Sequence, residues 1–287
     1  MSVVALFIVG LSLHSFRSEW LSLSAYWHQL CLASVSPSPW KSSYEAIVCG
    51  ASLPKNSNYF HLQQSGLLHM MVVSGAHLVF LQRLLLRIPF FPKVLLGPLL
   101  FLYCLCCQCQ PPVLKALSSF SIQQLNRHFK LFLQPAYGQW LSGLFCLTLF
   151  PEWWHSRSLM MSWLASAVIK SQKGLFLQSS LCFLLLIPLT QDFAQMNPWS
   201  VVSNILIGPL LGYWLFPLSL LSLPFPILSG LVDPLWLLFY KACHFFNENL
   251  FLSYWSEQDP ISNTWLWLYV LSTSFFLSYQ KRGNSFE

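Results

Sequence analysis

Residues 65–86 read SGLLHMMVVSGAHLVFLQRLLL, an apolar run that carries two histidines and a Ser-Gly pair. A helix of this length and composition can cross the hydrocarbon core of a bilayer, for which about 20 apolar residues suffice. His69 and His77 are ionisable, and ionisable side chains inside membrane segments usually face a cavity or the interior of a helix bundle. The stretch therefore predicts a membrane segment that lines a hydrophilic cavity.

Other residues of the stretch support this interpretation. On a continuous helix, His69 and His77 would lie about 80° apart, on adjoining faces. Ser74 is one turn before His77, and Gly75 permits either a close backbone approach or a break in the helix. Two alternatives stay open: histidines that only bond neighbouring helices, and a catalytic Ser74–His77 pair. The pair lacks a G-x-S-x-G turn and a nearby acid, so no enzymatic activity is expected.

The composition indicates a membrane protein. The 287 residues include 15 Lys or Arg and 9 Asp or Glu, so 8% are charged, whereas a soluble domain carries about 25%. Apolar residues make up 55% of the chain, and the mean hydropathy is +0.55. This composition excludes a soluble globular protein, which could not cover its surface, and also a disordered chain.

The distribution of the charges predicts many membrane segments. Charged residues collect between apolar windows, and none lies between Asp192 and Asp233. Runs such as LCFLLLIPL do not alternate, which favours helices over strands. We therefore expect an all-α, polytopic bundle of about eight to ten membrane segments, some broken or re-entrant because they contain proline. Beyond 65–86, these segments are expected at 94–110, 131–150, 158–170, 174–190, 199–217, 218–240 and 262–280.

Two domains are expected. Residues 1–16 predict a retained membrane helix or anchor, because a basic start and a cleavage site are missing. The Pro/Ser-rich stretch 34–43 predicts a linker. We therefore assign 1–44 to N-terminal membrane segments and linker, and 45–287 to a transmembrane channel domain. Within the latter, the charged stretch 115–130 predicts a loop.

A cluster of cysteines and the polar residue Asn204 both lie within apolar stretches. Four of the nine cysteines, residues 104–109, lie in an apolar run with spacings unlike those of zinc or iron–sulfur sites, so no metal or cofactor is expected. Asn204 lies in an uncharged window just before Gly208-Pro209. It predicts a broken helix near the membrane midplane, with an ordinary interhelical hydrogen bond as the alternative.

Several stretches together resemble the competence domain of the ComEC-type family of DNA-uptake channels. QQSGLLHMMVVSGAHLVFL (63–81) is similar to the family signature GLLHLLAISGLHV. QPPVLKAL (110–117) resembles a Pro-Val-x-Arg-Ala turn, with Lys115 where arginine is usual. SLMMSWLASAVIK (158–170) and SVVSNILIGPLLGYWLFP (200–217) resemble two further family segments. Their order and spacing agree with the family over roughly residues 45–245.

The resemblance implies a multi-pass protein of the bacterial inner membrane that passes single-stranded DNA into the cytoplasm. It marks six pore-lining or functional positions: His69, Ser74, Gly75, His77, Asn204 and Lys115. The family's OB-like and metallo-β-lactamase-like domains are expected to be missing, so a separate nuclease, receptor or helicase is an expected partner besides DNA and the bilayer. A channel for another hydrophilic solute and a non-transporting membrane scaffold remain alternatives.

Overall fold

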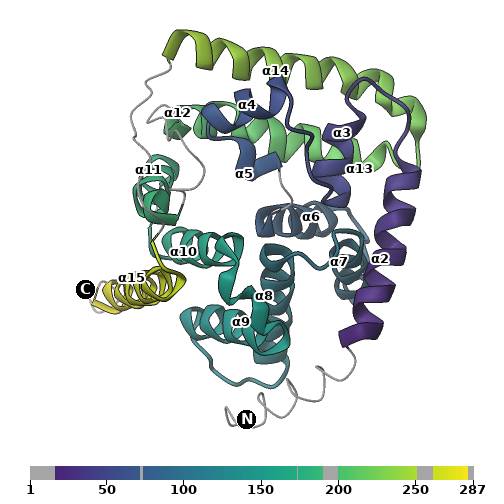
Figure 1. The fold of residues 1–287 in the computed structure, drawn as a ribbon. Coiled ribbons are helices and arrows are strands. Elements are labelled where there is room, and N and C mark those ends of the chain that lie inside the picture. Colours follow the sequence, from purple (N-terminus) through teal and green to yellow (C-terminus); the bar gives the residue numbers. More distant parts are fainter. Residues whose placement is uncertain (1–16, 72–73, 173, 190–199, 251–260, 284–287) are drawn as a thin grey trace. The chain divides into compact units, whose positions relative to one another are not determined.

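A computed structural model describes residues 17–71, 74–172, 174–189, 200–250 and 261–283. Every regular element among these residues is a helix, as the all-α prediction requires (Figure 1). The chain forms two compact units. Unit 1 comprises residues 1–20, 114–194 and 257–287, and unit 2 comprises 21–113 and 195–256. The expected N-terminal segment 1–16 lies outside the described residues.

Unit 2 contains the histidine-bearing stretch. Its core is aromatic: Phe216, Trp236 and Phe239 are fully buried, and the Tyr44 ring meets Trp236 edge-on at 5.9 Å. The Tyr44 hydroxyl donates a hydrogen bond of 2.8 Å to Asp233. Its helices are α2 (Arg17–Ser34), α3 (Lys41–Tyr44), the π-helix η1 (Glu45–Cys49), α4 (Ser57–Gln64), α5 (Leu68–Met71), α6 (Gly75–Arg87), α7 (Lys93–Cys106), α12 (Ser200–Leu206), the π-helix η5 (Leu210–Leu215), α13 (Phe216–Leu221), the short η6 (Pro226–Leu228) and α14 (Ser229–Leu250).

Unit 1 is built around α10 (Arg157–Ser171), which packs against α9, α11 and α15. At its centre, the fully buried Trp163 ring meets Trp140 and Trp267 edge-on, at 5.5 and 5.6 Å. Gly143 provides room for this ring, because a Cβ atom added there would overlap it. The other helices are α8 (Pro111–His128), α9 (Pro135–Leu149), η2 (Pro151–His155), α11 (Leu175–Leu186), η3 (Ile187–Leu189) and α15 (Asn263–Gly283).

The helical segments expected from apolar windows are confirmed as helices, but the loop predicted at 115–130 is wrong. This stretch lies almost entirely in α8, which is polar overall. Its apolar residues Val113, Leu114 and Leu117 are buried. A hydropathy window misses such a helix, because its average hides the difference between the buried and the exposed face.

Among the described residues, one helix is long and apolar enough to cross a membrane. It is the run Ser200–Leu221, which comprises α12, η5 and α13 and has a mean hydropathy of 1.6. Two shorter helical runs, Lys93–Cys106 and Leu175–Leu189, are also apolar.

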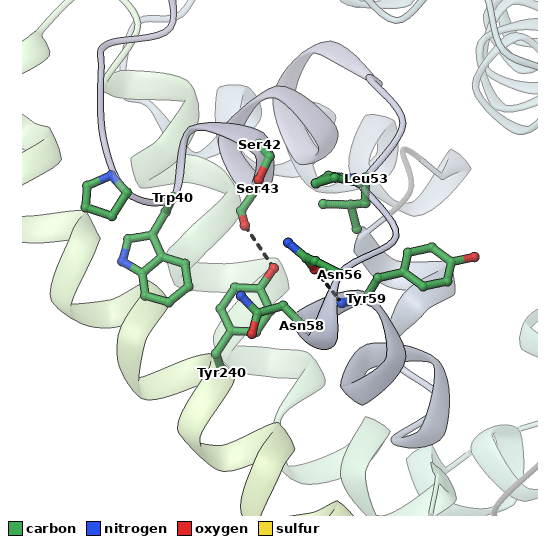
Figure 2. A pocket seen from close by; sticks show the side chains of 10 residues that line it. Trp40, Ser42, Ser43, Leu53, Asn56, Asn58, Tyr59 and Tyr240 are labelled. Atoms are coloured by element: carbon green, nitrogen blue, oxygen red, sulfur yellow. Dashed lines mark hydrogen bonds between the residues drawn. The ribbon is translucent and has the colours of Figure 1, made fainter.

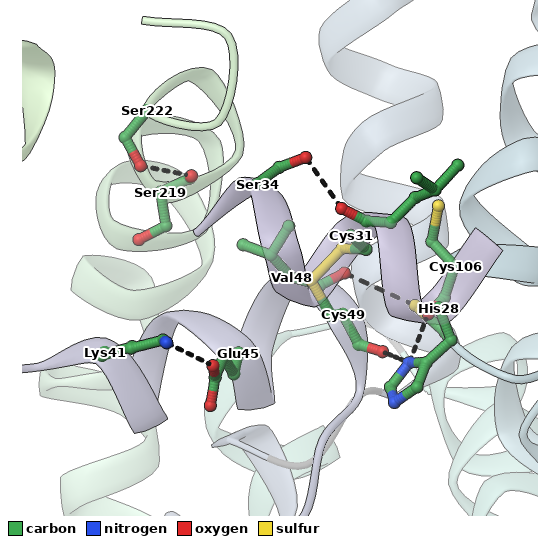
Figure 3. Close-up of a disulfide and its surroundings, with 12 residues drawn as sticks. His28, Cys31, Ser34, Lys41, Glu45, Val48, Cys49, Cys106, Ser219 and Ser222 are labelled. Atoms are coloured by element: carbon green, nitrogen blue, oxygen red, sulfur yellow. Dashed lines mark hydrogen bonds and ion pairs between the residues drawn. A yellow bond between two sulfur atoms is a disulfide. The ribbon is translucent and has the colours of Figure 1, made fainter. Parts of the chain in front are cut away.

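A disulfide, not expected from the sequence, joins Cys31 near the end of α2 to Cys49 at the end of η1 (Figure 3). The ring of His28 lies beside it, with Nδ1 at 3.0 Å from the Cys49 carbonyl oxygen and 2.9 Å from that of Cys106. Both neighbours are acceptors, so Nδ1 carries the hydrogen and donates to them. The disulfide and this histidine together fix α2 and η1 to the end of α7.

Candidate functional site

The stretch 65–86 is broken rather than continuous. The short helix α5 ends at Met71, and α6 begins at Gly75 after an extended Ser74. The faces derived for a continuous helix therefore do not apply, and the alternative of a discontinuous helix is confirmed. His69 lies exposed on α5, whereas His77 lies buried in the first turn of α6.

The break is held by a contact between Ser74 and His77. The backbone N–H of Ser74 donates to His77 Nδ1 at 3.0 Å, and the Ser74 hydroxyl lies 3.4 Å from the same nitrogen. A side chain three residues into a helix that accepts from the capping residue is half of a capping box. Since Nδ1 accepts from a backbone N–H, the neutral ring carries its hydrogen on Nε2. His77 therefore caps α6, and Nδ1 is occupied rather than free to activate the serine.

The turn before α5 packs against the start of α12. The Ser203 hydroxyl donates a hydrogen bond of 2.6 Å to the carbonyl oxygen of Ser65. At the next residue, Gly66 has φ +72°, and a Cβ atom there would overlap the side chain of Ser200. Both the left-handed backbone and this close approach require glycine. The chain thereby brings residue 66 and residue 200 together.

Further along, the same helical run stays in contact with the stretch. Met70 fits over Gly208, and the Phe80 ring lies over Gly212, where an added Cβ atom would come within 2.7 Å. The rings of His77 and Phe216 are 4.8 Å apart. Small residues of Ser200–Leu221 thus admit the bulky side chains of 65–86.

Asn204 lies on this helical run, half-buried, between these contacts. Its Oδ1 is buried and has no hydrogen-bond partner among the described residues. A buried amide oxygen without a partner is costly in a packed helix pair and is satisfied where water has access. The predicted break near Gly208-Pro209 takes the form of an interruption at Ile207, followed by the π-helix η5. Such π-helical distortions are frequent at functional sites.

Lys115 belongs to unit 1 and is 4% exposed. Its Nζ donates to the carbonyl oxygen of Ser162 at 3.1 Å and to the hydroxyl of Ser166 at 2.8 Å. It lies just beyond the apolar window 94–114. Burial, together with the smaller effect of the nearby positive charge of Lys170, lowers the pKa of Lys115 to about 7. Residue 115 is thus a buried cation, held by two oxygen acceptors, rather than a loop charge.

The structure therefore brings Ser74, Gly75 and His77 together at one helix start, with Asn204 on a helix that packs against the same stretch. His69 is on the neighbouring short helix, and Lys115 is in the other unit. That these six residues line one path stays a prediction. The pocket in Figure 2 is lined by none of them. No group of three or more potential metal ligands occurs among the described residues.

The capping role of His77 makes a testable prediction. Replacing it with leucine removes the acceptor for the Ser74 N–H, so we expect a loss of about 1 kcal/mol in the free energy of unfolding. Glutamine can accept the same bond from this position, so His77→Gln should lose less than half as much. Unfolding of the purified chain in detergent micelles measures both. Equal losses in the two variants would contradict the capping role.

Sequence reasoning missed the disulfide and the polar pocket. The only sequence signal for either was a pair of cysteines, Cys31 and Cys49, that stand apart from the cluster at 104–109. The pocket has no such signal, because its residues come from three separate stretches.

Comparison with known proteins places the chain in a family. A model of the competence protein family matches residues 55–281, which include α4 to α14. Searches of curated proteins and of solved structures give no match. Since the family model covers most of the chain, the protein belongs to the competence protein family.

Proposed function

We propose that this protein is a multi-pass channel of the bacterial inner membrane that translocates single-stranded DNA into the cytoplasm during natural transformation. Membership of the competence family supports a role in DNA uptake. The observation that carries the channel function is the broken stretch 65–86, packed along the apolar helical run Ser200–Leu221. Broken helices with free polar groups at membrane depth occur where they line a water-filled cavity.

The exposed apolar side chains support a lipid environment. Phe132 is 90% exposed, Ile227 87% and Val94 80%, and they come from both units. Large apolar side chains exposed to this degree, in this number, suit contact with lipid better than contact with water. Apart from the run Ser200–Leu221, further passes would include the shorter apolar helices Lys93–Cys106 and Leu175–Leu189.

In this proposal the polar positions guide the strand and carry out no reaction. His69, which is exposed on α5, is available to water and to the strand, whereas the buried, unpartnered oxygen of Asn204 would be satisfied only by water that enters between the helices. His77 and Ser74 keep the break open by capping α6. The occupied Nδ1 of His77 makes a hydrolytic Ser–His pair a poor alternative, and the nuclease that degrades the second strand would be another protein.

A non-transporting membrane scaffold is the second candidate. It is favoured by the capping contact of His77, which gives this residue a structural role that needs no cavity. The two candidates give different expectations for Asn204. In a scaffold the unpartnered oxygen would only cost stability, so a polar side chain would not be needed at this position.

Asn204→Leu tests the proposal. No hydrogen bond of Oδ1 is lost in this variant, so we expect unchanged folding and amount in the membrane, but labelled DNA should enter the cytoplasm at least tenfold less. Binding of DNA to the cell surface serves as the internal control. A gene deletion complemented by the wild-type chain sets the full range of the assay. Normal DNA uptake in the deletion strain would contradict the channel proposal. Normal uptake in the Asn204→Leu variant alone would show that this residue does not contribute to the path.

A further inference from the structure

A cluster of cysteines at the end of α7 has no role in the path described above. Its members are free thiols of unit 2, and all but one of them are buried. They are residues 104, 106, 107 and 109. Because they follow one another closely along the chain, the local backbone decides which of their thiols can meet.

The backbone at this place forms a Schellman motif, which selects one pair. The N–H of Cys109 donates to the carbonyl oxygen of Cys104 at 2.8 Å, and the N–H of Gln108 donates to that of Leu105 at 3.0 Å. Gln108 has φ +53°, the left-handed conformation that the motif needs just after the helix. The motif brings the side chains of the two residues that its longer bond joins into contact, and these are commonly apolar. Here both residues are cysteines.

The thiols of this pair are in contact. The thiol of Cys109 is hydrogen-bonded to that of Cys104, and both residues are buried. A disulfide requires Cβ atoms that face each other, which two touching thiols provide. The thiol of Cys107 is occupied elsewhere, because it donates to the carbonyl oxygen of Val48 at 3.6 Å.

The turn that the pair encloses has a backbone that needs support. Gln108 and Cys109 follow each other with φ +53° and +47°, a conformation that residues with a side chain seldom adopt. Such residues keep it only where the surrounding structure holds them. The turn also places Gln110, whose side-chain amide donates to the carbonyl oxygen of Gly50 at 2.6 Å. A covalent bond across the turn would hold both the backbone and this contact.

The pair lies close to cysteines that are already bonded. His28 Nδ1 joins the carbonyl oxygen of Cys49 to that of Cys106 (Figure 3). Disulfides form and persist on the oxidising side of a membrane, so the bond between Cys31 and Cys49 indicates that this end of α7 lies on that side. Cys31 and Cys49 are also buried. Burial in the folded chain therefore does not prevent a bond that forms during folding.

We propose that Cys104 and Cys109 form a second disulfide, which closes the end of α7. The oxidant is the disulfide of a thiol-oxidising protein outside the cytoplasm. One cysteine thiolate attacks that disulfide, so a mixed disulfide forms and one thiol of the oxidant is released. The other cysteine then attacks the mixed disulfide and releases the second thiol. Two electrons and two protons thus pass to the oxidant, which leaves as a dithiol. This inference does not depend on the channel function.

Alkylation in two steps tests the bond in the wild-type chain. Cells are quenched with acid, and the denatured full-length chain is treated with N-ethylmaleimide, then reduced and treated with iodoacetamide. Trypsin releases residues 94–115 as one peptide, which contains all four cysteines of the cluster. Tandem mass spectrometry should find iodoacetamide on Cys104 and Cys109, and N-ethylmaleimide on Cys106 and Cys107. N-ethylmaleimide on all four, or a different bonded pair, would overturn the proposal.

Two serine variants give a matched comparison by the same procedure. Cys104→Ser deprives Cys109 of its partner, so N-ethylmaleimide should label Cys109 and no cysteine of the peptide should carry iodoacetamide. Cys106→Ser removes a neighbouring thiol from the same helix end and should leave iodoacetamide on Cys104 and Cys109. If Cys109 stays protected from N-ethylmaleimide in Cys104→Ser, its partner is another cysteine and the assignment is wrong. Since the wild type is read directly, the test does not depend on the folding of either variant.

Discussion

Replacing Lys115 with methionine is expected to raise the free energy of unfolding at pH 7 by about 3 kcal/mol, because the variant no longer buries a cation without an acidic partner. In the wild type the Nζ of this residue has two oxygen acceptors, the Ser162 carbonyl and the Ser166 hydroxyl, and the described structure gives it no carboxylate. Methionine has a similar length and flexibility, so it fills the same space beside Trp163 without leaving a cavity.

The gain should depend on pH in a defined direction. The pKa of Lys115 falls from 10.5 in the unfolded chain to about 7 in the folded protein. Between these values the unfolded chain binds more protons, so the stability of the wild type rises as the pH rises from 7 to 10. Below pH 7 both states carry the proton, and the full destabilisation, on the order of 5 kcal/mol, is present. Lys115→Met should therefore stabilise most at and below pH 7 and very little at pH 10.

Unfolding of both chains in detergent micelles between pH 6 and 10 measures this difference. Lys93→Met, at an exposed lysine that begins α7, is the control and should change neither the stability nor its pH dependence. A wild type whose stability does not rise over this range would contradict the buried cation. DNA uptake by the same variant also tests residue 115 as part of the path: a more stable chain with lost uptake would support that assignment.

Removal of the disulfide is expected to cost about 3 kcal/mol of unfolding free energy. The bond between Cys31 and Cys49 closes a loop with a sequence separation of 18, which removes conformational entropy from the unfolded chain. It also holds α2 against η1. Cys31→Ser and Cys49→Ser should each show this loss, and the double variant should be no worse than either one.

Reduction of the wild-type chain provides an independent measurement. A thiol reductant should lower the stability of the wild type by about 3 kcal/mol more than that of the serine variants. Cys182→Ser is the matched control, because this free, half-buried cysteine of unit 1 takes no part in the bond. If the reductant does not change the stability of the wild type, the bond does not form in the purified protein.

The helices themselves could be predicted from the sequence, because burial of apolar residues leaves a local signal. The segments at 158–170 and 262–280 appear as α10 and α15, close to the expected bounds. The prediction of a loop at 115–130 was wrong because window hydropathy measures average apolarity, and α8 is polar on average. The same average identifies α10 and α15 correctly, because apolar residues predominate in them. Which face of α8 is buried is decided only by the neighbouring helices that pack against it.

The candidate site was predictable in its residues and only in part in its geometry. The Ser-Gly pair indicated that the helix could break, since residues 74 and 75 favour caps and turns. That His77 would cap the new helix start was not foreseen, because a histidine is rarely the third residue of a capping box. The contact of residue 66 with residue 200 is a long-range event and has no local signal.

By itself, the sequence determined that this protein is helical, rich in apolar residues and a member of the competence family, because composition and ordered motifs are properties of the chain alone. Only the tertiary structure decided that Lys115 is buried, that Cys31 pairs with Cys49, and that Trp40, Asn58 and Tyr240 form one pocket. Each of these depends on which distant residues become neighbours, and that is set by packing of the whole unit.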